Sequence, residues 1–142
     1  SGDPLMLAEA AEALSRAARP VIVVGAGVAR DDAWAETIEL AERHNAAVWV
    51  SPMSARNSFP ENHPLFAGFL ASDRARIVAS LTGSDLVLVL GAPAFTYHVE
   101  GSGPHVPPGA KLIGSDVKRH IHVAGLIEYL DPPPRPGLAC FS

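Results

Sequence analysis

Residues 84–97 read Ser-Asp-Leu-Val-Leu-Val-Leu-Gly-Ala-Pro-Ala-Phe-Thr-Tyr, and this stretch gives the clearest indication of the fold. Residues 86–90 are five branched apolar residues with no polar residue between them. A strand with one face in water alternates polar and apolar residues, so this strand is expected to be covered on both faces, as in a parallel sheet. Gly91, Ala92 and Pro93 end the strand, because proline cannot donate to a strand ladder. The stretch therefore predicts an inner strand of an α/β domain.

A second buried-strand pattern, residues 20–25, runs into the glycine turn formed by Gly25, Ala26 and Gly27. A strand, a glycine turn and a helix N-terminus can hold a phosphate through free backbone N–H groups and the helix dipole. The dinucleotide fingerprint needs a small residue where Arg30 stands, and Asp31 and Asp32 would repel phosphate. The competing interpretation is a tight turn between strand and helix, with Asp31 as the helix cap.

Ligands of open α/β sheets lie just outside the carboxyl ends of the strands. Both glycine turns follow strands, so both are predicted to lie at that edge. If a nucleotide binds, the candidate cofactor-binding residues are the members of these two turns: Gly25, Ala26, Gly27, Gly91, Ala92 and Pro93. The alternative is that both are only tight exit turns.

The remaining pattern alternates helices with strands, which is typical of a parallel sheet with crossover helices. Helices are predicted over residues 4–18, 32–45 and 72–81, the second closed by a left-handed Asn45 and the third capped by Ser72. Further strands are predicted over residues 46–51 and 111–117. The connection 52–68 contains three prolines, and its Arg56 and His63 are expected to pin backbone.

Composition narrows the function classes. The chain has 142 residues, a net charge of −4 and no run of Lys or Arg, which argues against a nucleic-acid partner. The single cysteine, Cys140, has no partner for an internal disulfide, which favours the cytoplasm. No apolar stretch approaches a membrane span. His98 and His105 have no third ligand at metal spacing, so no metal site is predicted.

The C-terminal part departs from this pattern. Residues 118–122 are basic and rich in histidine, residues 123–130 are short and apolar, and residues 131–137 are mostly proline. A proline segment of this kind cannot form a helix or an inner strand. We therefore expect a Rossmann-like domain over residues 1–117, followed by an atypical Pro-rich tail over 118–142 that is extended, disordered or truncated.

Four segments, residues 18–25, 41–51, 56–68 and 84–98, resemble the central domain of thiamine-diphosphate-dependent decarboxylases. The similarity covers residues 4–116. Its specific parts are the Phe-Pro-x-x-His-Pro-x-Phe-x-Gly connection and the Gly-Ala-Pro-x-Phe-x-Tyr-His segment. Within the superfamily, the group around benzoylformate decarboxylase is the most similar.

The resemblance implies a parallel sheet with helices on both faces, set between two further α/β domains. In such enzymes one flanking domain holds the pyrimidine ring of the cofactor, and the other holds its diphosphate and Mg²⁺ through a Gly-Asp-Gly…Asn motif. This sequence contains no Gly-Asp-Gly motif. We therefore expect no catalytic residue, no thiamine diphosphate site and no decarboxylation by the chain alone.

The expected partners are the two other domains of the parent enzyme and a second copy of the chain. If an outer strand is missing after residue 117, the sheet keeps an open edge, and open edges pair readily. The alternative function is a Rossmann-like module that binds ADP or FAD at the two glycine turns.

Overall fold

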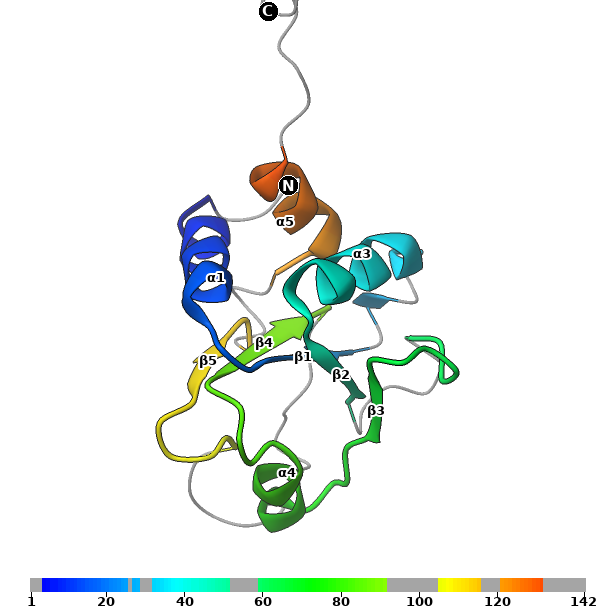
Figure 1. Cartoon of the computed structure of the whole chain (residues 1–142), viewed down its shortest axis with the longest axis vertical. Coiled ribbons are helices and arrows are strands. Elements are labelled where there is room, and N and C mark those ends of the chain that lie inside the picture. Colours follow the sequence, from blue (N-terminus) through cyan, green and yellow to red (C-terminus); the bar gives the residue numbers. More distant parts are fainter. Residues whose placement is uncertain are drawn as a thin grey trace, which may run out of the picture.

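The computed structural model describes residues 4–25, 27–28, 32–51, 59–91, 105–115 and 121–131. Its centre is a sheet of five parallel strands in the order β3-β2-β1-β4-β5 (Figure 1). The strands are β1 (Pro20–Val24), β2 (Ala47–Val50), β3 (Phe66–Phe69), β4 (Leu86–Leu90) and β5 (Lys111–Ile113). The predicted parallel α/β sheet is thereby confirmed.

The two strands predicted to be inner, β1 and β4, lie side by side at the middle of the sheet. Their register runs from Pro20 opposite Leu86 to Val24 opposite Leu90. Every residue of both strands is buried. Successive side chains of a strand point to opposite faces, so burial of all five residues requires a cover on each face. The unbroken apolar runs in the sequence reflect this double cover.

One face of the sheet is covered by α1 (Pro4–Arg16), α3 (Trp34–His44) and α5 (Val123–Leu130) (Figure 1). Each helix turns an apolar stripe toward the sheet, and α1 does so with residues at helical spacing. Ile22 of β1 and Leu88 of β4 are fully buried beneath this layer. Complete burial of such a side chain contributes about 1.5–3 kcal/mol, so this layer forms the main core.

The opposite face carries α4 (Arg74–Ser80) and part of the segment 105–110 (Figure 1). Ile77 and Leu81 from the α4 region and Val106 pack there against Val23 and Val89. The expectation of helices on both faces is therefore confirmed. This second core is smaller than the first, because α4 has only seven residues.

Several helix boundaries differ from the predicted ones. Helix α1 ends at Arg16 rather than residue 18. Helix α3 begins at Trp34 because Asp32 has a left-handed backbone (φ 53°), which a right-handed helix cannot include. Its N-cap position is Ala33 and not Asp31, which lies outside the described residues. The left-handed C-cap at Asn45 is confirmed, with φ 51° and ψ 47°.

Helix α4 is capped by Asp73 rather than by Ser72. The Asp73 carboxylate accepts a hydrogen bond from the backbone N–H of Ala75 at 3.2 Å, as an N-cap does. Strand β5 stops at Ile113, earlier than the predicted end at residue 117. Residues 116 and 117 lie outside the described part of the chain.

Two elements were not predicted. Strand β3 is a four-residue edge strand that begins inside the expected connection 52–68 and ends one residue beyond it, and a register shift interrupts its pairing with β2. Helix α5 lies in the expected tail, where Ile121 forms an isolated bridge with Leu90 and Leu126 is fully buried. Residues 121–131 are therefore part of the packed domain, and residues 132–142 lie outside the description.

Candidate functional site

The two glycine turns meet where β1 and β4 end. The N–H group of Gly25 donates to the carbonyl of Leu90 at 2.9 Å, and that of Gly27 donates to the carbonyl of Gly91 at 3.4 Å. The structure thus brings the predicted turns together at the carboxyl edge of the sheet. Of the predicted site residues, Ala26, Ala92 and Pro93 lie outside the described residues.

Glycine is required at this meeting point by contacts within the protein. A Cβ atom on Gly91, whose φ is +63°, would lie 2.6 Å from the backbone nitrogen of Val28. A Cβ atom on Gly27 would lie 3.1 Å from the Cα of Gly91. The first distance is shorter than any tolerated contact. The close approach of the two turns therefore explains both glycines without a ligand.

The described backbone donors of the first turn are engaged in the protein itself. Besides the bonds made by Gly25 and Gly27, the N–H group of Val28 donates to the carbonyl of Gly25 at 3.2 Å. Phosphate binding at a glycine turn depends on N–H groups that point at the ligand without another acceptor. A diphosphate placed here would have to displace these bonds or use other donors.

Other donors lie at the beginning of α5. A cavity of about 250 Å³ opens beside the glycine turns, and the described residues that line it include Gly27, Gly91 and the α5 residues Val123, Ala124 and Gly125. The N-cap residue His122 makes no side-chain capping bond. The cavity is smaller than the roughly 300–1,000 Å³ of ordinary ligand pockets. It has room for a phosphate group rather than for a whole dinucleotide.

The contribution of α5 to this cavity was missed in the sequence. Because of the proline run after residue 131, the whole segment 118–142 was interpreted as an atypical tail. A helical signal is nevertheless present, because Val123, Leu126, Ile127 and Leu130 recur at i, i+3, i+4 and i+7. That spacing predicts an amphipathic helix, and a helix after an edge strand returns to cover the sheet.

At the amino ends of the strands, Asp85 bonds to the segment that joins α1 to β1. Its carboxylate accepts the N–H groups of Ala18 at 2.7 Å and Arg19 at 2.9 Å, and its backbone N–H donates to the Arg19 carbonyl at 3.2 Å. The hydrogen bond from Ala18, with smaller support from Arg19, holds the pKa of Asp85 below its ordinary value. The interaction fixes the join between α1 and β1 to the beginning of β4.

A cavity of about 530 Å³ lies beside this clamp. Its walls include Glu9, Glu12, Arg16, Asp85 and Lys111. It opens at the amino ends of β4 and β5, whereas ligands of open α/β sheets bind at the carboxyl ends. The Glu12–Arg16 and Glu9–Lys111 pairs, at 3.1 and 3.7 Å, already neutralise four of its charges. Size alone therefore does not make it the candidate site.

His63 pins backbone, as predicted. Its Nδ1 accepts the N–H of Leu65 at 3.0 Å, and its Nε2 lies 2.9 Å from a carboxylate oxygen of Glu42 on α3. The Phe59 ring packs edge-on against the imidazole, with centroids 5.2 Å apart. With Nδ1 accepting, Nε2 carries the proton and donates to Glu42. Arg56, the other residue predicted for this role, lies outside the described residues.

Within the described ranges, no three His, Cys, Asp or Glu side chains come close enough to hold a metal ion. In the same part of the chain, no helix is both long and apolar enough to cross a membrane. The strand order, the parallel pairing and the glycine turns at the carboxyl edge place the protein among the Rossmann-like α/β domains.

The particular family follows from comparison with known proteins. Residues 7–122 match the family described as thiamine pyrophosphate enzyme, central domain, and the chain belongs to that family. Thiamine pyrophosphate and thiamine diphosphate are two names for one cofactor. The resemblance stated from the sequence is thereby confirmed.

Individual relatives share the family and differ in reaction. Benzoylformate decarboxylase of Pseudomonas aeruginosa is 43% identical over 110 residues, which are 78% of this chain and 21% of the relative. An acetolactate synthase of Mycobacterium bovis is 36% identical over 115 residues, covering 77% of this chain and 18% of the relative. The chain thus spans about a fifth of the length of these relatives.

A solved structure agrees. The thiamine diphosphate-dependent 4-hydroxybenzoylformate decarboxylase of Rhodococcus jostii RHA1 matches with a TM-score of 0.75 and 34% sequence identity. The match covers 96% of this chain and 29% of that one. Here too the similarity extends over one domain of a longer protein.

Proposed function

We propose that this chain is the central domain of a thiamine-diphosphate-dependent 2-oxo acid decarboxylase that acts on benzoylformate or a close analogue. The observation that carries the proposal is the 43% identity to benzoylformate decarboxylase, against 36% to the acetolactate synthase. The flanking domains would bind thiamine diphosphate and Mg²⁺, and the cofactor would accept the electron pair left after loss of CO₂.

In this role the chain contributes structure and no decarboxylation of its own. Its two glycine turns pack against each other at Gly27 and Gly91. This contact supports a packing role for the turns, which would otherwise be the candidates for cofactor contact. Its partners would be the other two domains and, through the outer strand β5, a second copy of the enzyme. The acidic net charge of −4 supports the absence of a nucleic-acid partner, and the single cysteine fits the reducing cytoplasm.

The test is an assay of the full-length protein that carries this domain, with thiamine diphosphate and Mg²⁺ added. We expect CO₂ release from benzoylformate, with pyruvate a poorer substrate and little acetolactate formed. The 142-residue chain alone, under the same conditions, is expected to release none. Acetolactate as the main product would assign the protein to the synthase branch of the family and contradict the proposed substrate.

A second candidate function is a module that binds ADP or FAD, favoured by the cavity at the start of α5. Thermal unfolding of the chain with ADP, FAD, NAD and thiamine diphosphate plus Mg²⁺ distinguishes the two. A ligand at a hundredfold its dissociation constant adds about 2.7 kcal/mol, which raises the unfolding midpoint by roughly 8–11 °C at this size. We expect no shift with any of the four. A shift with ADP or FAD would establish the module.

A further inference from the structure

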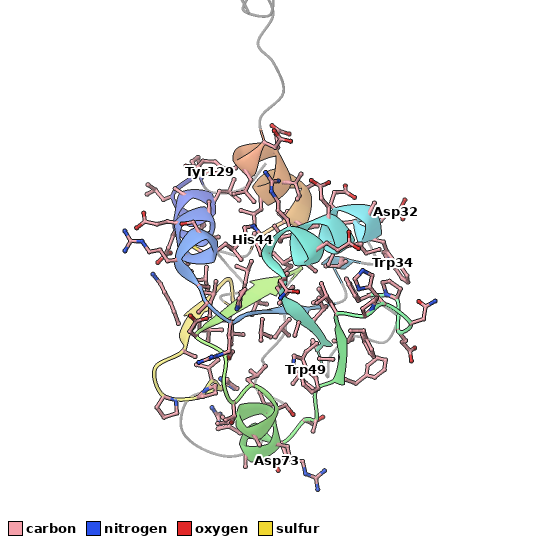
Figure 2. The ribbon with its side chains drawn as sticks, in the orientation of Figure 1. Asp32, Trp34, His44, Trp49, Asp73 and Tyr129 are labelled. Atoms are coloured by element: carbon pink, nitrogen blue, oxygen red, sulfur yellow. The ribbon has the colours of Figure 1, made fainter. Side chains whose placement is uncertain are left out.

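The face of the sheet that carries α4 is incompletely covered by the described residues. On β1 and β4, Val23 and Val89 are fully buried beneath α4. On β2, by contrast, Ala47 and Trp49 on the same face remain partly exposed. Figure 2 shows Trp49 on the side of the sheet where α4 lies. The cover therefore ends between β1 and β2.

A groove of about 420 Å³ lies where this cover ends, and we call it the β2 groove. Its apolar described residues include Val21, Ala47, Trp49, Ala67 and Leu81. The Trp49 ring is part of its lining and lies beside Gly68 of the edge strand β3, at 3.1 Å from where a Cβ atom would stand. A large aromatic side chain that stays partly exposed beside an apolar groove is typical of an interaction surface.

The charges around the β2 groove define its occupant. Among the described residues that line it, Arg19 is the only charged one, and its Nε already donates to the Gly83 carbonyl at 2.7 Å. The rim is otherwise made of neutral polar groups such as Asn45 and Thr82. A basic peptide would find no opposite charge there, and an acidic peptide or a nucleic acid would find only Arg19. The lining therefore favours an apolar, uncharged occupant.

The position of the groove argues against a small-molecule ligand. The residues Pro20, Val21 and Ala47 that line it stand at the amino ends of β1 and β2. Ligands of such sheets bind at the other edge, where the glycine turns meet. An apolar protein surface is therefore the better match.

We propose that the β2 groove is the docking surface for an apolar, uncharged surface of a flanking domain of the same polypeptide. The relatives are about five times as long as the matched segment, which is 21% of the benzoylformate decarboxylase chain. Interfaces between domains of one chain bury roughly 600–1,500 Å². The inference rests on the proposed function only in that flanking domains exist.

The test uses Trp49 as a reporter, in a background in which Trp34 and every tryptophan of the other domains are replaced by phenylalanine, so that its fluorescence is the only tryptophan signal. Acrylamide quenching is compared between the 142-residue chain and the full-length protein that carries it. We expect Trp49 to be severalfold less accessible in the full-length protein. Equal quenching in both would show that no domain covers the groove, and would overturn the proposal.

A pair of charge variants locates the contact. Ala67→Glu places a carboxylate at the exposed rim of the groove, and Ala79→Glu places one on the exposed side of α4, outside it. Neither is expected to change the unfolding of the chain alone. In the full-length protein, Ala67→Glu is expected to raise Trp49 quenching toward the value of the isolated chain, and Ala79→Glu to leave it unchanged. Equal effects of both variants would contradict a contact at the groove.

Sedimentation of the 142-residue chain tests the alternative that the groove binds a second copy of the chain. A dimer in which Trp49 is shielded, and which Ala67→Glu converts to monomer, would assign the groove to self-association and overturn the proposal. The quenching of Trp49 does not depend on which substrate the full-length enzyme uses, so the docking surface and the proposed function are tested separately. A full-length protein that shields Trp49 but releases no CO₂ from any 2-oxo acid would refute the proposed function and leave the docking surface established.

Discussion

The backbone N–H of Gly27 donates to the carbonyl of Gly91 at 3.4 Å, so the turns that end β1 and β4 contact each other directly. The two residues are 64 positions apart in the sequence but adjacent at the carboxyl edge of the sheet. Each occupies the space in which the side chain of the other would stand. The edge at which related folds bind ligands is closed here, at this point, by the protein itself.

Replacement of Gly91 by alanine should be strongly destabilising. The new Cβ would lie 2.6 Å from the Val28 nitrogen, and the residue has a φ of +63°. A left-handed backbone costs an alanine about 1–2 kcal/mol, and overpacking adds about 1–3 kcal/mol. We expect a loss of about 3 kcal/mol in the free energy of unfolding, measured by urea denaturation.

Gly83→Ala is the matched control for that change. Gly83 also has a positive φ, +95°, but nothing lies within 4 Å of its would-be Cβ. Only the backbone cost of about 1–2 kcal/mol should therefore remain. If both variants lowered the free energy of unfolding by the same amount, the close contact at Gly91 would contribute nothing to stability. The glycine at position 91 would then need another explanation.

Asp85→Asn should weaken the clamp at the other edge of the sheet. Both carboxylate oxygens of Asp85 accept backbone N–H groups, from Ala18 and Arg19. An amide offers one oxygen and one NH₂ group, so one of the two donors would face another donor. We expect a loss of about 1–2 kcal/mol at neutral pH, measured by urea denaturation.

The clamp also predicts how stability changes in acid. The hydrogen bond from Ala18 keeps the pKa of Asp85 lower in the folded protein than in the unfolded chain. The unfolded chain therefore takes up the proton first, and the stabilisation is lost as the pH falls through about 4 and below. The Asp85→Asn variant should lack this component, so its midpoint should fall less steeply with acid. Asp131→Asn, at an exposed position, should keep the wild-type slope.

Two histidines predict a separate loss of stability in mild acid. Burial, with the neighbouring Arg43, lowers the pKa of His44, and burial with Arg74 lowers that of His105. Figure 2 shows His44 at the end of α3. Because the unfolded chain binds these protons more readily, stability should fall as the pH drops below the ordinary histidine value of about 6.5. The double variant His44→Gln and His105→Gln should flatten the profile between about pH 7 and pH 5. An unchanged slope would exclude both side chains as its source.

The inner strands could be predicted because burial on both faces leaves a local signature, an unbroken run of branched apolar residues. The same holds for Asn45, since few residues besides asparagine and glycine tolerate a left-handed cap. Strand β3 left no such signature, because its four residues include Gly68 and its edge position leaves Phe69 exposed. The candidate site depended on a contact between turns far apart in the sequence, and its α5 wall was hidden by the neighbouring prolines. Pairings of this kind are set by the assembled sheet rather than by local residue preferences.

The imidazole of His63 should stabilise the β2–β3 connection mainly through its acceptor nitrogen. Its side chain is 12% exposed, and Nδ1 provides the acceptor for the Leu65 N–H, while Glu42, the partner of Nε2, is 59% exposed. An exposed pair contributes little, about 0–1 kcal/mol, whereas an unsatisfied buried donor costs about 1–3 kcal/mol. Glu42→Gln should therefore change stability by less than about 1 kcal/mol, and His63→Ala should cost about 2 kcal/mol.

His63→Asn separates the two nitrogens, because its amide oxygen can stand near the position of Nδ1 and accept the same N–H group. We expect it to recover more than half of the stability lost in His63→Ala, as measured by urea denaturation. Hydrogen exchange of the Leu65 amide should follow the same order, fast in the alanine variant and protected in the asparagine variant. If Glu42→Gln instead matched His63→Ala while asparagine failed to rescue, the hydrogen bond from Nε2 to Glu42 would be the dominant interaction, and the acceptor nitrogen would contribute little.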